Sequence, residues 1–233
     1  MTGHIGHGSR SNEFKSLGGR CFQWHCPAFD LPTQRRSAHC EDLRRQSQSR
    51  RGRFAGASEL ADVRLFRAGE FSRVFICNGM LHEGDRIRPE KRLEEIDLSS
   101  IETVFRANTF TPLLWLKHLV GSLRSEQICT LTLFSARVGS ISDNKLGGWY
   151  GYRASKAALN MLVQTASVEY ARRAKNVQLV VFHPGTTDTA LSRPFQGNVP
   201  EGKLFSADFV AEQLLSIVEN MTPVGHALYL DWQ

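Results

Sequence analysis

Most of the chain after Phe71 alternates short apolar runs with longer helical patterns, and this alternation constrains the fold more than any other feature. The apolar runs cover 74–77, 128–134, 177–182 and 227–230, and the helical patterns cover 101–123, 153–173 and 207–220. Strands that alternate with helices of this length are typical of βαβ units, whose strands are parallel. We therefore predict an α/β fold with a parallel sheet, in one domain over residues 1–233, and Ser206 as the N-cap of the last helix.

Positive charge is concentrated before this pattern begins. Residues 1–55 hold ten Lys and Arg against four Asp and Glu, whereas residues 56–233 hold nineteen of each. Clustered arginines attract phosphates, so an arm that binds nucleic acid or a membrane is one interpretation. Because aromatic residues are not interleaved with the arginines and no amphipathic period appears, we favour a solvated, poorly ordered segment. We expect neither nucleic acid nor a membrane as a partner.

The sequence offers little evidence for export or for a metal. Met1–Arg20 lacks the continuous apolar stretch of a secretory signal, and the run 177–182 is far shorter than a bilayer span, which predicts a cytoplasmic protein. A zinc site can be imagined, since zinc takes Cys and His ligands, but the spacing departs from that of common zinc sites. We expect no metal and reduced thiols. The candidate ligands would be Cys21, His25, Cys26, His39 and Cys40.

Tyr152 and Lys156 stand at the start of the predicted helix over 153–173. A spacing of four places the phenol and the ammonium on one helical face. A fixed cation beside a phenol favours the phenolate and lowers the phenol pKa. An ordinary surface pair has the same spacing, so the pair alone leaves both interpretations open.

The order of motifs around this pair is more specific. One strand runs into Ser135–Ser140, another into His183–Thr189, and an earlier one into Cys77–Met80, while Asn108 lies on a helix. In this combination residues 71–233 resemble the short-chain dehydrogenase/reductase family. The resemblance is greatest to its C-factor-like carbonyl reductase branch, through Ser135–Ile141, Gly147-Gly148-Trp149 and Tyr152–Asn160.

This resemblance implies a Rossmann-like doubly wound sheet and an oxidoreductase that uses NAD or NADP on a small-molecule carbonyl or alcohol. Tyr152 would be the general acid/base, and Lys156 would bind the nicotinamide ribose hydroxyls and lower the tyrosine pKa. Asn108 would hold a proton-relay water; local helix bonding is its alternative role. The substrate pocket would include the apolar stretch 194–205.

The resemblance also implies a set of cofactor-binding residues. Asn78-Gly79 matches the family's Asn-Ala-Gly turn, where glycine allows close approach, although Met80 replaces the last glycine. Pro184-Gly185 and Thr189 match the Pro-Gly-x-x-x-Thr stretch that flanks the nicotinamide and its phosphates.

The substrate-polarising serine is less clearly placed. Aligning Ser135-Ala136 on the family's Ser-Ser puts alanine at the expected position, and strand alternation points Ser135 to the opposite side. Ser140, twelve residues before Tyr152, is our preferred replacement. A solvent-facing loop serine is the alternative.

The N-terminal part departs from the family. The glycine stretch Thr2–Gly8 is one residue short between its glycines, and only Met1 precedes it, so the first strand is apparently missing or degraded. We therefore expect the strand ending at Cys77 to have an exposed edge. A shifted reading frame in this part is our hypothesis. The alternative function is then a catalytically impaired family member, in a binding or signalling role or as the product of a disrupted gene, with weak or no cofactor binding.

The two long helices suggest self-association. Residues 101–123 and 153–173 carry more apolar residues than one buried stripe requires, and the family resemblance implies pairing through these helices. We therefore expect a homodimer or homotetramer.

Overall fold

A parallel sheet organises the protein. The computed structural model describes residues 20–24, 69 and 71–231, the first of these ranges through its backbone. Five strands form one parallel sheet in the order β1-β2-β3-β4-β7. Their bounds are β1 (Arg20–Trp24), β2 (Phe71–Ile76), β3 (Cys129–Phe134), β4 (Val177–Phe182) and β7 (Leu228–Leu230).

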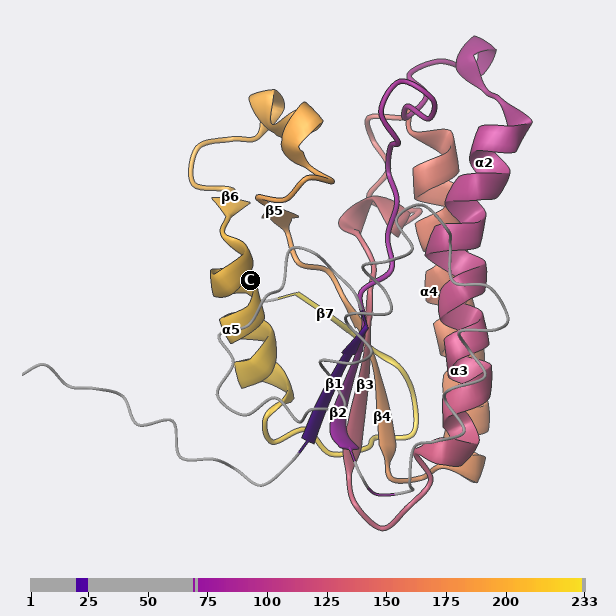
Figure 1. The fold of residues 1–233 in the computed structure, drawn as a ribbon, viewed down its shortest axis with the longest axis vertical. Coiled ribbons are helices and arrows are strands. Elements are labelled where there is room, and N and C mark those ends of the chain that lie inside the picture. The colour runs from indigo at the N-terminus through magenta and orange to yellow at the C-terminus, as the bar shows by residue number, and fades with distance from the viewer. Residues whose placement is uncertain (1–19, 25–68, 70, 232–233) are drawn as a thin grey trace, which may run out of the picture.

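Helices cover both faces of this sheet (Figure 1). One face carries α2 (Leu98–Phe105), α3 (Thr111–Ser122) and α4 (Tyr150–Arg173), and the other carries α5 (Ala207–Val218). Short elements complete the loops: β5 (Thr186–Thr187) pairs with β6 (Leu204–Phe205), and 3-10 turns cover Leu93–Glu95, Arg137–Gly139 and Arg193–Asn198. The doubly wound, Rossmann-like α/β architecture is confirmed, and the Ser206 side chain accepts the Phe209 N–H as the N-cap of α5.

The expectation of an exposed edge on β2 is wrong, because β1 lies there in parallel. The backbone groups of an inner strand need partners, and Arg20–Trp24 supplies them. The sequence pattern of this strand is short, because only Phe22 and Trp24 alternate with other residues and the surrounding N-terminal residues are rich in Arg, Cys and His. Thr2–Gly8, His25, Cys26, His39 and Cys40 lie outside the described residues.

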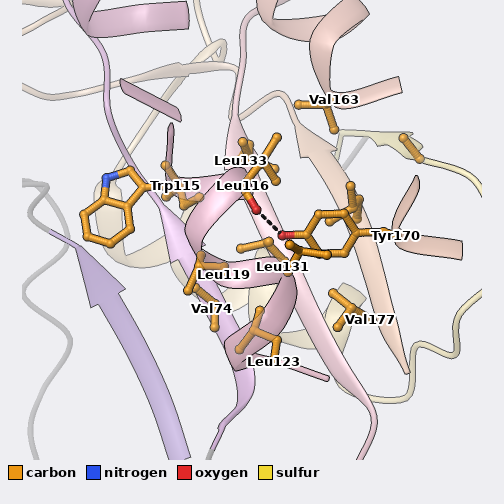
Figure 2. Close-up of a cluster of buried hydrophobic side chains, with 14 of the residues drawn as sticks. Val74, Trp115, Leu116, Leu119, Leu123, Leu131, Leu133, Val163, Tyr170 and Val177 are labelled. Carbon is orange, nitrogen blue, oxygen red and sulfur yellow. Dashed lines mark hydrogen bonds between the residues drawn. The ribbon is translucent and has the colours of Figure 1, made fainter. Parts of the chain in front are cut away.

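Alternating strand residues divide the core between the two faces. Val74 and Ile76 pack with the α3 and α4 side, whereas Phe75 packs with the α5 side. Figure 2 shows the larger cluster, in which the buried Tyr170 hydroxyl donates to the Leu116 carbonyl at 2.7 Å. This bond joins α4 to α3, and burial raises the pKa of Tyr170.

A π-helical turn, Arg106–Phe110, joins α2 to α3. Pro112 explains the wider turn, because proline has no N–H to donate to the Asn108 carbonyl and its ring would clash with that carbonyl in a regular helix. The Thr111 N–H instead bonds to the Arg106 carbonyl, five residues back. Asn108 and Thr109, both buried, lie in this turn.

No helix within residues 71–231 has the length and apolar content needed to cross a membrane. The same range contains no cluster of three His, Cys, Asp or Glu side chains arranged to hold a metal ion.

Tyr170→Phe should lower the free energy of unfolding by about 1–3 kcal/mol, because it leaves the buried Leu116 carbonyl without its donor. Tyr229→Phe is the matched control: this hydroxyl donates to Asn160, but the residue is 48% exposed, and water can replace the bond. Urea unfolding of both variants measures the difference. Equal losses would contradict the importance of the Tyr170 bond.

Candidate active site

Tyr152 and Lys156 lie in the first two turns of α4 and are both buried, with exposed fractions of 9% and 2%. Burial raises the pKa of Tyr152 to about 12. Burial lowers the pKa of Lys156 to about 8, against a smaller opposing effect of Cys77. The expected lowering of the tyrosine pKa is therefore wrong for this structure, because loss of hydration dominates.

The Lys156 ammonium is anchored at the end of β3, where Nζ donates to the Phe134 carbonyl at 2.7 Å. Gly139 packs directly against the same helical turn: a Cβ added there would lie 2.9 Å from the Lys156 backbone carbon. A Cβ on Gly79 would lie 3.8 Å from Lys156 Nζ. The loops after β2 and β3 therefore both lie close to this lysine.

Asn108 ties the π-helical turn to the same place. Its Oδ1 accepts the Met80 N–H at 2.7 Å, and its Nδ2 donates to the Met80 carbonyl and to Ser155 Oγ, each at 2.9 Å. Thr109 Oγ1 donates to the Ser155 carbonyl at 2.8 Å, and Ser155 Oγ donates to the Tyr152 carbonyl at 2.8 Å. The Asn108 side chain thus does more than bond locally within its helix.

The predicted cofactor residues lie at the carboxyl ends of β2 and β4. Asn78 Oδ1 is buried and has no hydrogen-bond partner among the described residues, so it can accept a ligand hydroxyl. Gly185 has φ of 72°, a left-handed conformation that favours glycine in the turn after Pro184. The Thr189 N–H bonds to Ser192 Oγ at 3.3 Å. Together with the Lys156 ammonium beside Gly79, the unpartnered Asn78 oxygen fits the hydroxyls of a ribose at the carboxyl end of β2.

The two serine candidates have different surroundings. Ser135 is buried, and its hydroxyl donates to Oδ1 of Asn160, on α4, at 2.7 Å. The proton of this hydroxyl is therefore already used in a hydrogen bond. Ser140 Oγ lies 3.2 Å from Ser142 Oγ and accepts the Asp143 N–H at 3.4 Å. Ser140 also lines a cavity of about 270 Å³ on the side of α4 that carries Tyr150 and Arg153. Tyr152 does not line that cavity, so the structure does not bring Ser140 and Tyr152 together there.

Aromatic rings adjoin Tyr152. Its ring centroid lies 6.2 Å from that of Trp149, and Trp149 lies 5.1 Å from Phe195. His82, in the loop after β2, lies 5.6 Å from Phe195. The predicted apolar stretch 194–205 therefore approaches Tyr152 through Phe195. Sequence reasoning missed His82, because an isolated polar loop residue carries no pattern.

Glu90 is a second residue that sequence reasoning missed. It is 7% exposed, and its carboxylate accepts the Gly151 N–H, next to Tyr152. Pro89 and the surrounding charged residues give it the appearance of a solvated loop residue, and no spacing relates it to α4.

Two known proteins are similar to this chain in sequence. C-signal of Myxococcus xanthus is 28% identical over 141 residues, which cover 60% of this chain and 80% of that protein. The 1-hydroxy-2-glutathionyl-2-methyl-3-butene dehydrogenase of Rhodococcus sp. (strain AD45) is 31% identical over 128 residues, 55% of this chain and 54% of that protein. The match therefore spans about half the length of the second relative.

Among solved structures, the NADPH-bound carbonyl reductase from chicken fatty liver superposes with a TM-score of 0.61 at 20% identity, over 84% of this chain and 81% of that one. Similarity at this identity shows the fold. The model of the short chain dehydrogenase family matches residues 76–199, more than half of the 233 residues and the whole stretch from Asn78 to Thr189. The chain therefore belongs to the short-chain dehydrogenase family.

Proposed function

We propose that this protein is an NAD- or NADP-dependent oxidoreductase that reduces a small-molecule carbonyl, or oxidises the corresponding alcohol. The observation that carries the proposal is the buried Tyr152 and Lys156 pair on α4, next to Gly79 and the Asn108 network. The dehydrogenase and the NADPH-bound carbonyl reductase among the similar proteins support the same chemistry and cofactor.

The described residues are suited to the ribose and nicotinamide end of such a cofactor, which supplies or accepts a hydride when bound. Lys156 has three N–H donors, and the Phe134 carbonyl accepts one, so others can reach ribose hydroxyls. The buried Asn78 Oδ1 can accept a hydroxyl in the same area. Pro184, Gly185 and Thr189 would flank the nicotinamide in the loop after β4.

Tyr152 moves the proton in this proposal. With its pKa raised to about 12, the phenol keeps its proton at neutral pH and can donate it to the carbonyl oxygen of the substrate. In the protonated state the phenol is the acid for reduction, and in the reverse reaction the phenolate would be the base. Asn108, with its side chain fixed on Met80 and Ser155, is our candidate for holding a proton-relay water.

Ser140 stays our candidate for polarising the substrate carbonyl, although it and Tyr152 do not line one cavity in this structure, so the role requires the Ser140 loop to move toward the phenol. Its hydroxyl is engaged within its own loop, and rotation of the O–H could exchange that partner for a carbonyl oxygen. Ser135 is the poorer choice because Asn160 already accepts its proton.

One observation favours the second candidate function, a catalytically impaired binding protein. In doubly wound folds a glycine turn that receives phosphates follows the first strand, at its carboxyl end. Thr2–Gly8 precedes β1 in the sequence, and residues 25–51, which follow β1, contain no glycine. Weak binding of the pyrophosphate would limit activity even with an intact tyrosine and lysine pair.

We also propose that the protein forms a homodimer or homotetramer through α3 and α4. The core of one chain already buries four of the apolar residues on these helices, namely Trp115, Leu119, Leu159 and Val163. Fewer apolar side chains therefore remain exposed for self-association than the sequence suggested. Those that remain are Phe110, Leu114, Met161 and Val168, which are between 41% and 66% exposed.

Tyr152→Phe should lower turnover of a carbonyl substrate by about 100-fold or more, because the ring keeps its packing and loses the transferable proton. NADPH consumption with a panel of small ketones and aldehydes measures the effect. Tyr150→Phe, two residues away on α4, is the matched control and should keep its turnover. Thermal stabilisation by NADH or NADPH in both variants tests cofactor binding separately. Its absence in the unaltered protein would favour the impaired alternative.

The rate of reduction should fall as the pH rises through about 8. Since burial lowers the pKa of Lys156 to about 8, the ammonium is charged below that pH and is lost above it, whereas Tyr152 stays protonated. A profile of kcat/KM against pH, with folding followed by circular dichroism, measures this. A rate that stays constant to about pH 10 would contradict the role given to the lysine charge.

A further inference from the structure

The N-terminus of α4 lacks a cap of its own. The N-cap residue is Trp149, whose side chain makes no capping hydrogen bond. Its backbone is left-handed, with φ of 53° and ψ of 43°, and it is the one described non-glycine residue with a positive φ. The first N–H groups of a helix have no partner within the helix, and a tryptophan does not favour this backbone conformation. Something outside α4 must satisfy the first turn.

Glu90, in the loop between β2 and α2, supplies that partner. Its Oε2 accepts the Gly151 N–H at 3.2 Å, and its backbone carbonyl accepts the Trp149 N–H at 2.5 Å. The side chain is almost completely buried, with 7% exposed. A carboxylate at a helix N-terminus is also stabilised by the helix dipole. Glu90 alone therefore accepts two N–H groups at the start of α4, those of Trp149 and Gly151.

The glycines around α4's start leave room for this contact. A Cβ added to Gly151 would lie 2.9 Å from Glu90 Oε1 and 3.2 Å from Ile101 Cγ1. Gly148 has φ of 63°, and a Cβ there would lie 3.3 Å from the Glu90 carbonyl oxygen. A side chain at Gly151 would displace the Glu90 carboxylate and crowd Ile101, and one at Gly148 would crowd the Glu90 backbone and strain the left-handed turn.

Tyr152 follows Gly151 directly, and its ring packs against Trp149. Any shift of the first turn of α4 therefore moves the phenol relative to Lys156, which is anchored separately on Phe134 one turn later. We infer that Glu90 is a positioning residue for Tyr152: its carboxyl group caps α4 from another loop and fixes where the phenol stands. This inference rests on the proposed function for its kinetic consequence.

Two variants of Glu90 test separately whether the length of its side chain or its negative charge matters for the cap. Glu90→Gln keeps the length and an acceptor oxygen, and should retain kcat within about threefold. Glu90→Asp keeps the charge but withdraws the carboxylate by one methylene, and should lower kcat by about 10-fold or more, because small displacements of a reacting group are costly. The KM for NADPH should stay within about twofold in both, since the cofactor residues are untouched. Glu94→Ala, an exposed carboxylate in the next turn, is the control and should match the unaltered protein.

Amide hydrogen exchange measures the same contact without turnover. The Gly151 amide should exchange about 10-fold faster in Glu90→Asp than in Glu90→Gln, while amides in the second half of α4 stay equally protected. Equal kcat in the Asp and Gln variants, the reverse ranking, or a uniform loss of protection along α4 would overturn the inference. If the unaltered protein turns over no carbonyl, the proposed function fails, and the Gly151 amide still decides whether Glu90 sets the start of α4.

Discussion

An ammonium group with 2% of its residue exposed loses nearly all of its hydration, and the described site is arranged around this cost at Lys156. The Phe134 carbonyl at the end of β3 provides a fixed partner at 2.7 Å. Because that carbonyl belongs to the sheet, the second turn of α4 is held at the carboxyl end of β3. Gly139 is required by the same contact, since a side chain there would displace the Lys156 backbone. The lowered lysine pKa is the electrostatic result of the burial.

A second anchor fixes α4 through the turn between α2 and α3. Pro112 prevents a regular helix between α2 and α3, and the resulting π-helical turn places Asn108 and Thr109 against Ser155. Asn108 also holds both backbone groups of Met80, in the loop after β2. The buried polar groups are therefore satisfied by partners on three separate chain segments, which restricts them to one arrangement. Tyr152 and Lys156 acquire defined positions because their helix is held at both of these places.

The sequence predicts helices and strands well where an apolar pattern continues over many residues or a capping residue marks the end of a helix. The strand over 177–182 and the helix cap at Ser206 are confirmed, because continuous apolar runs and capping residues act locally. Asn78, Gly79, Pro184 and Gly185 follow β2 and β4 as their positions after apolar runs predict, whereas Asn108, Tyr152 and Lys156 come to this end of the sheet through long-range contacts. Glu90 could not be predicted, since its partner lies 61 residues away and only the folded chain brings them together. The pKa of Tyr152 could not be predicted from its spacing to Lys156, because spacing does not reveal burial.

Because β1 pairs with β2, the N-terminal part does supply a strand to the sheet, and what it must also supply is a phosphate-binding turn. The strand β1 pairs with β2, so the edge of β2 is covered. What a dinucleotide needs in addition is a place for its phosphates, and backbone N–H groups at a glycine turn and helix start usually provide it. In our proposal Lys156 and Asn78 hold a ribose, but an ammonium and an amide oxygen near one end of the sheet do not replace that phosphate site. In our proposal Lys156 therefore serves both ribose binding and proton transfer, whereas affinity for the pyrophosphate depends on groups that the tyrosine and lysine pair does not supply.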